Sequence, residues 1–105
     1  AGNYQELEGP GAARPILEHH GFTLAQTERI CYLIGRHHTY KDMDGLDYQI
    51  LVEADFLVNI FEEGHSRQSI ENVREKIFRT ASGRKLLDTL YLAPSGRIPA
   101  EYPDR

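Results

Sequence analysis

Apolar residues recur at intervals of three and four along most of the chain, which is the spacing of the buried face of an amphipathic helix. Glycine, serine and threonine, which favour helix ends, divide this pattern into segments. No segment alternates apolar and polar positions between turns, as a half-buried strand would. The pattern predicts helices from residue 10 or 12 to 20, over 23–38, over 46–63, from 66 or 69 to 78, and over 80–91. The predicted fold class is therefore all-α, a bundle of about five helices.

The expected ends of these helices follow from a few residues. We expect Gly9-Pro10-Gly11 to break the backbone before the first helix, and Gly21 to end that helix. Thr23-Leu24-Ala25-Gln26 fits the capping-box pattern at the start of the second helix. Gly64 should end the third. Three prolines after Ala93 predict an irregular tail over residues 94–105, so the helical domain should cover residues 1–93.

Composition narrows the class of protein. A chain of 105 residues is one domain of modest size, and no apolar run approaches the length of a membrane span. The net charge of −4, from 12 basic and 16 acidic residues, argues against binding of nucleic-acid polymers and leaves a nucleotide substrate open. A single cysteine, Cys31, allows no intramolecular disulfide and suits the reducing cytoplasm, where we expect the protein to act.

Two adjacent histidines and one aspartate occupy unusual places in the helical pattern. His37 continues the apolar stripe of the second predicted helix, beside His38, and Asp55 falls between Leu51 and Val58 in the third. A carboxylate on such a stripe needs a protein donor, a protonated histidine or a metal ion as its partner. These residues therefore form either a satisfied polar core or a metal site. Gly35, unfavourable inside a helix, suggests close approach of another backbone or of a ligand beside the pair.

Other charged or polar groups have simpler interpretations. Asp42 to Glu53 has the length of a calcium loop, but Leu46 and Asp47 stand at its fifth and sixth positions, so we expect a solvated acidic loop that caps the next helix. His19 and His20 fit the last turn of a helix, where they interact with its dipole. Residues 42–63 hold seven acidic and no basic residues, whereas residues 74–85 hold five basic ones, which indicates either solvated faces or complementary docking.

A series of short motifs occurs in a distinctive order over roughly residues 3 to 92. They are Glu8-Gly9-Pro10, residues 13–17, Ile34-Gly35-Arg36-His37-His38, Gly45-Leu46-Asp47, Ile50-Leu51-Val52-Glu53-Ala54-Asp55 and Leu57-Val58-Asn59. This order resembles the second half of the HD-domain metal-dependent phosphohydrolases. The resemblance implies an all-helical bundle that holds one or two divalent metals between an early histidine, a His-Asp dyad and a later aspartate. Members with two metals add histidines between the dyad and that aspartate.

The resemblance assigns roles to four residues. Asp55 is the terminal metal ligand, His37 and His38 are the intervening pair, and Glu8 stands where some relatives have a histidine. The implied cofactor is a divalent ion (Mn, Fe, Co, Ni, Mg or Zn) that polarises a phosphoryl oxygen and supplies hydroxide for attack. Nucleotides or related phosphoesters are the implied substrates.

The chain also departs from the family pattern. It contains no His-Asp dipeptide, and no histidine precedes Glu8. We therefore expect a partial HD-type domain from the C-terminal part of a longer protein, itself inactive as a phosphohydrolase. The alternative is a catalytically inactive helical module that acts by self-association or partner binding. Uncovered apolar stripes predict a homodimer, its register set by the acidic and basic segments.

Overall fold

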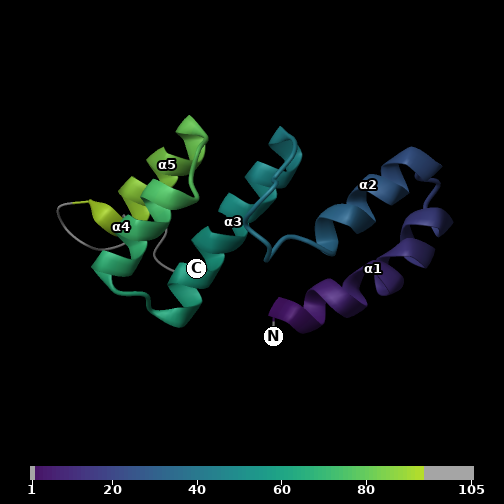
Figure 1. Ribbon diagram of the computed structural model, residues 1–105, viewed down its shortest axis with the longest axis horizontal. Helices are drawn as coiled ribbons and strands as arrows, with labels where there is room; N and C mark the ends of the chain where they lie inside the picture. Colours follow the sequence, from purple (N-terminus) through teal and green to yellow (C-terminus); the bar gives the residue numbers. More distant parts are fainter. Residues whose placement is uncertain (1, 94–105) are drawn as a thin grey trace. The chain divides into compact units, whose positions relative to one another are not determined.

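The computed structural model describes residues 2–93, and within them the chain is all-α, as the hydrophobic pattern predicts (Figure 1). The predicted tail over residues 94–105 lies outside the described residues. The described helices belong to two compact units, one within residues 1–44 and the other within residues 45–105. No helix in the described part of the chain has the length and apolar character needed to cross a membrane.

The first unit pairs α1 (Gly2–His19) with α2 (Leu24–Ile34). The prediction of a break at Gly9-Pro10-Gly11 is wrong, because α1 runs through it with Pro10 and Pro15 inside the helix. Packing on α2 explains this continuity. A Cβ at Gly9 would lie 2.5 Å from Ile34 Cγ2, so the glycine allows the helices to approach closely. The Pro10 ring in turn packs against Gly35, at the ordinary contact distance of 3.4 Å from a Cβ built there.

The start of α2 is as predicted, but its end is not. Thr23 Oγ1 accepts a hydrogen bond from the Gln26 N–H, and Gln26 Oε1 accepts one from the Thr23 N–H, which completes the capping box. The helix ends at Ile34 rather than at His38. The bonding pattern changes at Arg36, whose N–H donates to the Leu33 carbonyl, three residues back, and the His38 N–H then donates to the Glu6 carboxylate at 2.7 Å.

The second unit contains α3 (Leu46–Glu63), α4 (Arg67–Lys76), α5 (Ala81–Leu87) and the short π-helix η1 (Asp88–Leu92). Gly64 ends α3 in the left-handed conformation, as predicted, with φ of 66°. Ser66 rather than Ser69 caps α4, and Thr80 caps α5. A buried cluster from α3, α4, α5 and the α4–α5 turn forms the core of this unit, made of Ile60, Ile70, Phe78 and Leu87.

The end of the last predicted helix differs from a regular α-helix. After Leu87 the chain continues as η1, and the hydroxyl of Tyr91 in η1 donates to the Leu57 carbonyl of α3 at 2.7 Å. Burial raises the pKa of Tyr91 above its ordinary value. Helical periodicity predicts the apolar face of this segment but does not distinguish an α-turn from a π-turn.

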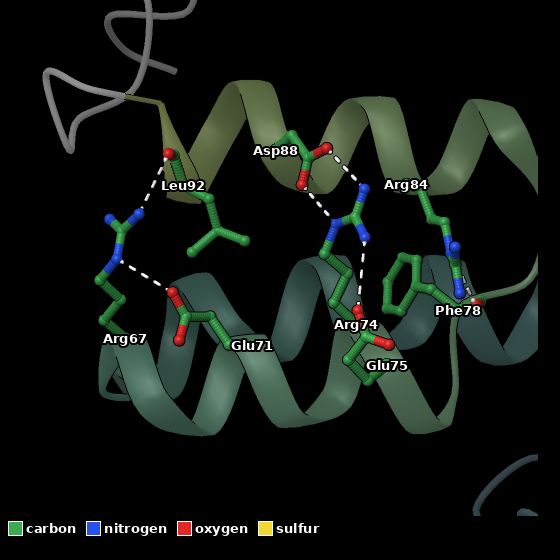
Figure 2. A network of polar contacts seen from close by, with 8 residues as sticks. All are labelled: Arg67, Glu71, Arg74, Glu75, Phe78, Arg84, Asp88 and Leu92. Carbon is green, nitrogen blue, oxygen red and sulfur yellow. Dashed lines mark hydrogen bonds and ion pairs between the residues drawn. The ribbon is translucent and has the colours of Figure 1, made fainter.

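Polar contacts join α4 to η1, and α5 to the α4–α5 turn, along one side of the second unit (Figure 2). The Arg74 guanidinium donates to both carboxylate oxygens of Asp88, at 2.6 and 2.9 Å, and this contact lowers the pKa of Asp88. Arg84 donates to the Phe78 carbonyl. Arg79 donates to two carbonyls at the end of α4 and to the Phe78 carbonyl just after it. All three arginines of the basic segment predicted over residues 74–85 thus make contacts within this unit.

The loop before α3 does not cap that helix as predicted. The N-cap position is Gly45, with φ of 116° and no side-chain hydrogen bond. Asp47 lies in the first turn, where its carboxylate accepts from the Tyr48 N–H and faces the positive end of the helix dipole. Asp44 instead interacts within the first unit, where its carbonyl accepts from Arg29 at 2.6 Å.

Candidate metal centre

The two candidate histidines lie side by side in the turn that follows α2. The ring centroids of His37 and His38 are 3.9 Å apart, with the planes inclined by 42°. Neighbours within a helix would point about 100° apart. Because α2 ends at Ile34, this restriction does not apply, and a ligand nitrogen of one histidine lies within 4.8 Å of a ligand nitrogen of the other. Two nitrogens on opposite sides of one ion are separated by about 4.2 Å, so little side-chain movement would suffice.

Hydrogen bonds from side chains hold this turn in place. His37 Nδ1 lies 2.8 Å from the Ile34 carbonyl oxygen, which is the acceptor that the His38 N–H would use in a continuing helix. The His38 N–H donates to Glu6 Oε2, and the Thr39 hydroxyl donates to the same oxygen at 3.1 Å. The Glu6 carboxylate therefore replaces the helical acceptor of the His38 N–H, and the His37 ring replaces the helical donor to the Ile34 carbonyl.

Two residues of α1 contact the pair, and sequence reasoning missed both. Besides Glu6, Gln5 places its amide oxygen 2.8 Å from His38 Nε2. The predicted ligand Glu8 is exposed on α1, one turn further along. Gln5 and Glu6 lie more than thirty positions from His38 in the sequence, so spacing could not indicate these contacts.

Asp55 lies on α3, in the second unit, where it is half-buried. One of its oxygens accepts a hydrogen bond from Asn59 Nδ2 at 3.1 Å. Since α3 belongs to a different unit from the histidines, convergence of Asp55 on them stays a prediction. Of the two apolar residues expected beside Asp55, Leu51 is half-buried. Val58 is 55% exposed, which contradicts its assignment to a core-facing stripe.

Glu53, not Asp55, is the most buried carboxylate among the described residues, with 2% of its surface exposed. Its Oε1 accepts from the Thr80 hydroxyl at 2.6 Å. Its Oε2 accepts from the N–H groups of Arg79 and Thr80 and from Gln49 Nε2, at 2.6 to 3.0 Å. Burial raises the pKa of Glu53, but the hydrogen bonds, the Thr80 hydroxyl first, outweigh burial, and the pKa is lowered.

These contacts make Glu53 a structural residue that holds the α4–α5 turn against α3. Both of its oxygens are occupied by donors, so the carboxylate is not poised to accept a proton from a substrate. The sequence did contain a signal that Glu53 faces the core. Glu53 lies in the middle of a stripe with alternating spacings of four and three, formed by Leu46, Ile50, Glu53, Leu57 and Ile60.

An open groove runs between α3 and α5 beside Glu53. It has a volume of about 370 Å³. Most of its lining is apolar, and Leu46, Ile50 and Leu86 are 66%, 51% and 43% exposed, respectively. Such exposure is typical of surfaces that bind a partner. The homodimer expected from the sequence stays a prediction.

A second histidine pair provides a contrast to the candidate site. His19 and His20 lie at the end of α1, both exposed, with ring centroids 5.1 Å apart in an edge-to-face arrangement. His19 is the last residue of α1, as the helix-dipole interpretation expects. This pair is therefore a suitable control for His37 and His38.

No protein-family model, curated protein or solved structure matches this chain. The likeness to HD-domain enzymes therefore depends on the motifs in the sequence, and the function that they imply is a proposal.

Proposed function

We propose that this chain is part of a metal-dependent phosphohydrolase of the HD type, and that His37, His38 and Asp55 hold its divalent cation. The observation that carries the proposal is the turn after α2, which places two adjacent imidazoles 3.9 Å apart within a motif order that resembles this family. Imidazole and carboxylate are suitable ligands for Mn, Fe, Co, Ni and Zn. The role of Asp55, and that of Glu8 as a further ligand, rests on the resemblance.

The proposed division of labour follows from the groups present. A bound divalent ion would supply Lewis acidity and an activated water toward a phosphoester or a nucleotide. The imidazoles would hold the ion, and α1 would keep the turn that carries them in place through Glu6. Because the 105 residues contain no His-Asp dipeptide, we expect this chain by itself to bind the cation weakly and to show negligible hydrolysis.

A second candidate function is a catalytically inactive helical module that acts by self-association. The exposed apolar groove between α3 and α5 favours it. Metal binding discriminates between the two proposals, because a self-associating module has no requirement for a cation at the histidine pair.

We expect Co²⁺ to bind the chain, and His37→Ala to weaken that binding at least about 10-fold. Removing a residue that supports a metal ligand lowers metal affinity by about that much, and removing the ligand itself should lower the affinity at least as far. Calorimetric titration of the wild-type chain and of the variant measures both affinities. The matched control is the double variant His19→Ala, His20→Ala, which removes an exposed histidine pair from another turn. Equal affinity of the wild type and His37→Ala, or a loss confined to the control, would contradict the metal proposal.

A further inference from the structure

We propose that Gln5 and Glu6 of α1 are positioning residues that fix the orientation of the histidine pair and the nitrogen that each ring presents. Their role toward a metal rests on the proposed function. The contacts themselves all lie within the first unit.

The tautomer of His37 follows from its acceptor. A neutral imidazole has one N–H donor and one nitrogen with a lone pair. The Ile34 carbonyl oxygen, 2.8 Å from His37 Nδ1, can only accept a hydrogen bond. The proton of neutral His37 must therefore be on Nδ1, and Nε2 carries the lone pair that a cation requires.

The tautomer of His38 is the opposite one. Its Nε2 lies 2.8 Å from the amide oxygen of Gln5, which likewise can only accept. Neutral His38 therefore carries its proton on Nε2 and its lone pair on Nδ1. Adjacent histidines would thus present different nitrogens, Nε2 from the first and Nδ1 from the second, because each has a different acceptor.

Glu6 sets up this arrangement through the backbone. Its carboxylate accepts hydrogen bonds from the His38 N–H and from the Thr39 hydroxyl. In a continuing helix the His38 N–H would instead donate to the Ile34 carbonyl. The Ile34 carbonyl is then available to the ring of His37. Removing the Glu6 carboxylate should leave the His38 N–H to compete with the His37 ring for the Ile34 carbonyl, which would disturb both rings.

The test is long-range ¹H–¹⁵N spectroscopy of the histidine rings in metal-free protein, at a pH about two units above 6.5, where imidazole is neutral. We expect His37 as the Nδ1–H form and His38 as the Nε2–H form. The exposed rings of His19 and His20 should show averaged ¹⁵N shifts and serve as internal references. Gln5→Leu should move the His38 shifts toward those averaged values and leave His37 unchanged. Glu6→Ala should move both rings toward the averaged values, whereas Glu18→Ala, an exposed site on the same helix, should change neither.

Co²⁺ titration of the same variants provides the second readout. Loss of a residue that orients a ligand lowers metal affinity by about 10- to 100-fold, so Gln5→Leu and Glu6→Ala should each do so. An averaged or Nε2–H form of His37, or an Nδ1–H form of His38, would overturn the positioning roles whether or not the metal binds. Predicted tautomers in a chain that binds no Co²⁺ would instead overturn the proposed function and leave the assignment of the ring protons intact.

Discussion

Replacing Glu53 by methionine should lower the free energy of unfolding by about 3 kcal/mol or more, because it removes the acceptor of several buried donors at once. The donors are the Thr80 hydroxyl, the N–H groups of Arg79 and Thr80, and Gln49 Nε2. Glu53→Gln should lose less, about 1–2 kcal/mol, since one amide oxygen can still accept from the backbone N–H groups.

Urea titration followed by circular dichroism measures these losses. The matched control is Glu62→Met, an exposed glutamate on the same helix, which should change the free energy of unfolding by no more than about 0.5 kcal/mol. A Glu53→Met variant as stable as this control would show that the carboxylate does not hold the α4–α5 turn.

The same residue makes a prediction about pH. The pKa of Glu53 lies below its ordinary value of 4.5, so the folded protein binds fewer protons there than the unfolded chain. Its contribution is therefore fully present above pH 4.5 and is lost as the pH falls through the lowered value. The difference in stability between wild type and Glu53→Gln should stay constant from pH 7 to about 5 and shrink below it. A difference that grows on acidification would have the wrong sign.

Gly83→Ala should destabilise the chain by about 2 kcal/mol, although glycine to alanine ordinarily strengthens a helix. A Cβ at Gly83 in α5 would overlap Glu53 Oε1 and lie 2.8 Å from Thr80 Oγ1. Either the carboxylate or α5 must then move, and the hydrogen bonds of Glu53 weaken.

Gly11→Ala on α1 is the matched control, because a Cβ there would meet nothing within 4 Å. It should stabilise the chain by about 0.5–1 kcal/mol. The cost of Gly83→Ala should also fall in the Glu53→Gln background, since the two residues are in contact. Urea titration of the four chains of this cycle measures the coupling, and strict additivity would show that the glycine is required for another reason.

Local sequence signals predicted most helix ends, because the groups that end these helices are close in sequence. Thr23, Ser66 and Thr80 each cap a helix through an N–H three residues later, and Gly64 ends α3 by its own backbone conformation. Hydrophobic periodicity in the same way predicts the number and type of the helices, since each buries an apolar face.

Contacts between distant residues account for the features that were missed. The helix α1 continues through Pro10 and packs on Ile34 and Gly35, and the turn after α2 is held by Glu6, which accepts from the His38 N–H. Glu53 can be buried because its carboxylate accepts hydrogen bonds from the α4–α5 turn, more than twenty-five residues away in the sequence. None of these partners is apparent until the helices are paired.

We propose that His37 and Asp55 bind the same cation, and anomalous diffraction from crystals grown with Mn²⁺ tests this claim most directly. We expect one anomalous peak within about 2.3 Å of His37 Nε2 and of a carboxylate oxygen of Asp55, the distance range of metal ligands. A peak elsewhere would contradict the claim. So would side chains more than about 10 Å apart, which no single ion could bridge at ligand distances near 2 Å.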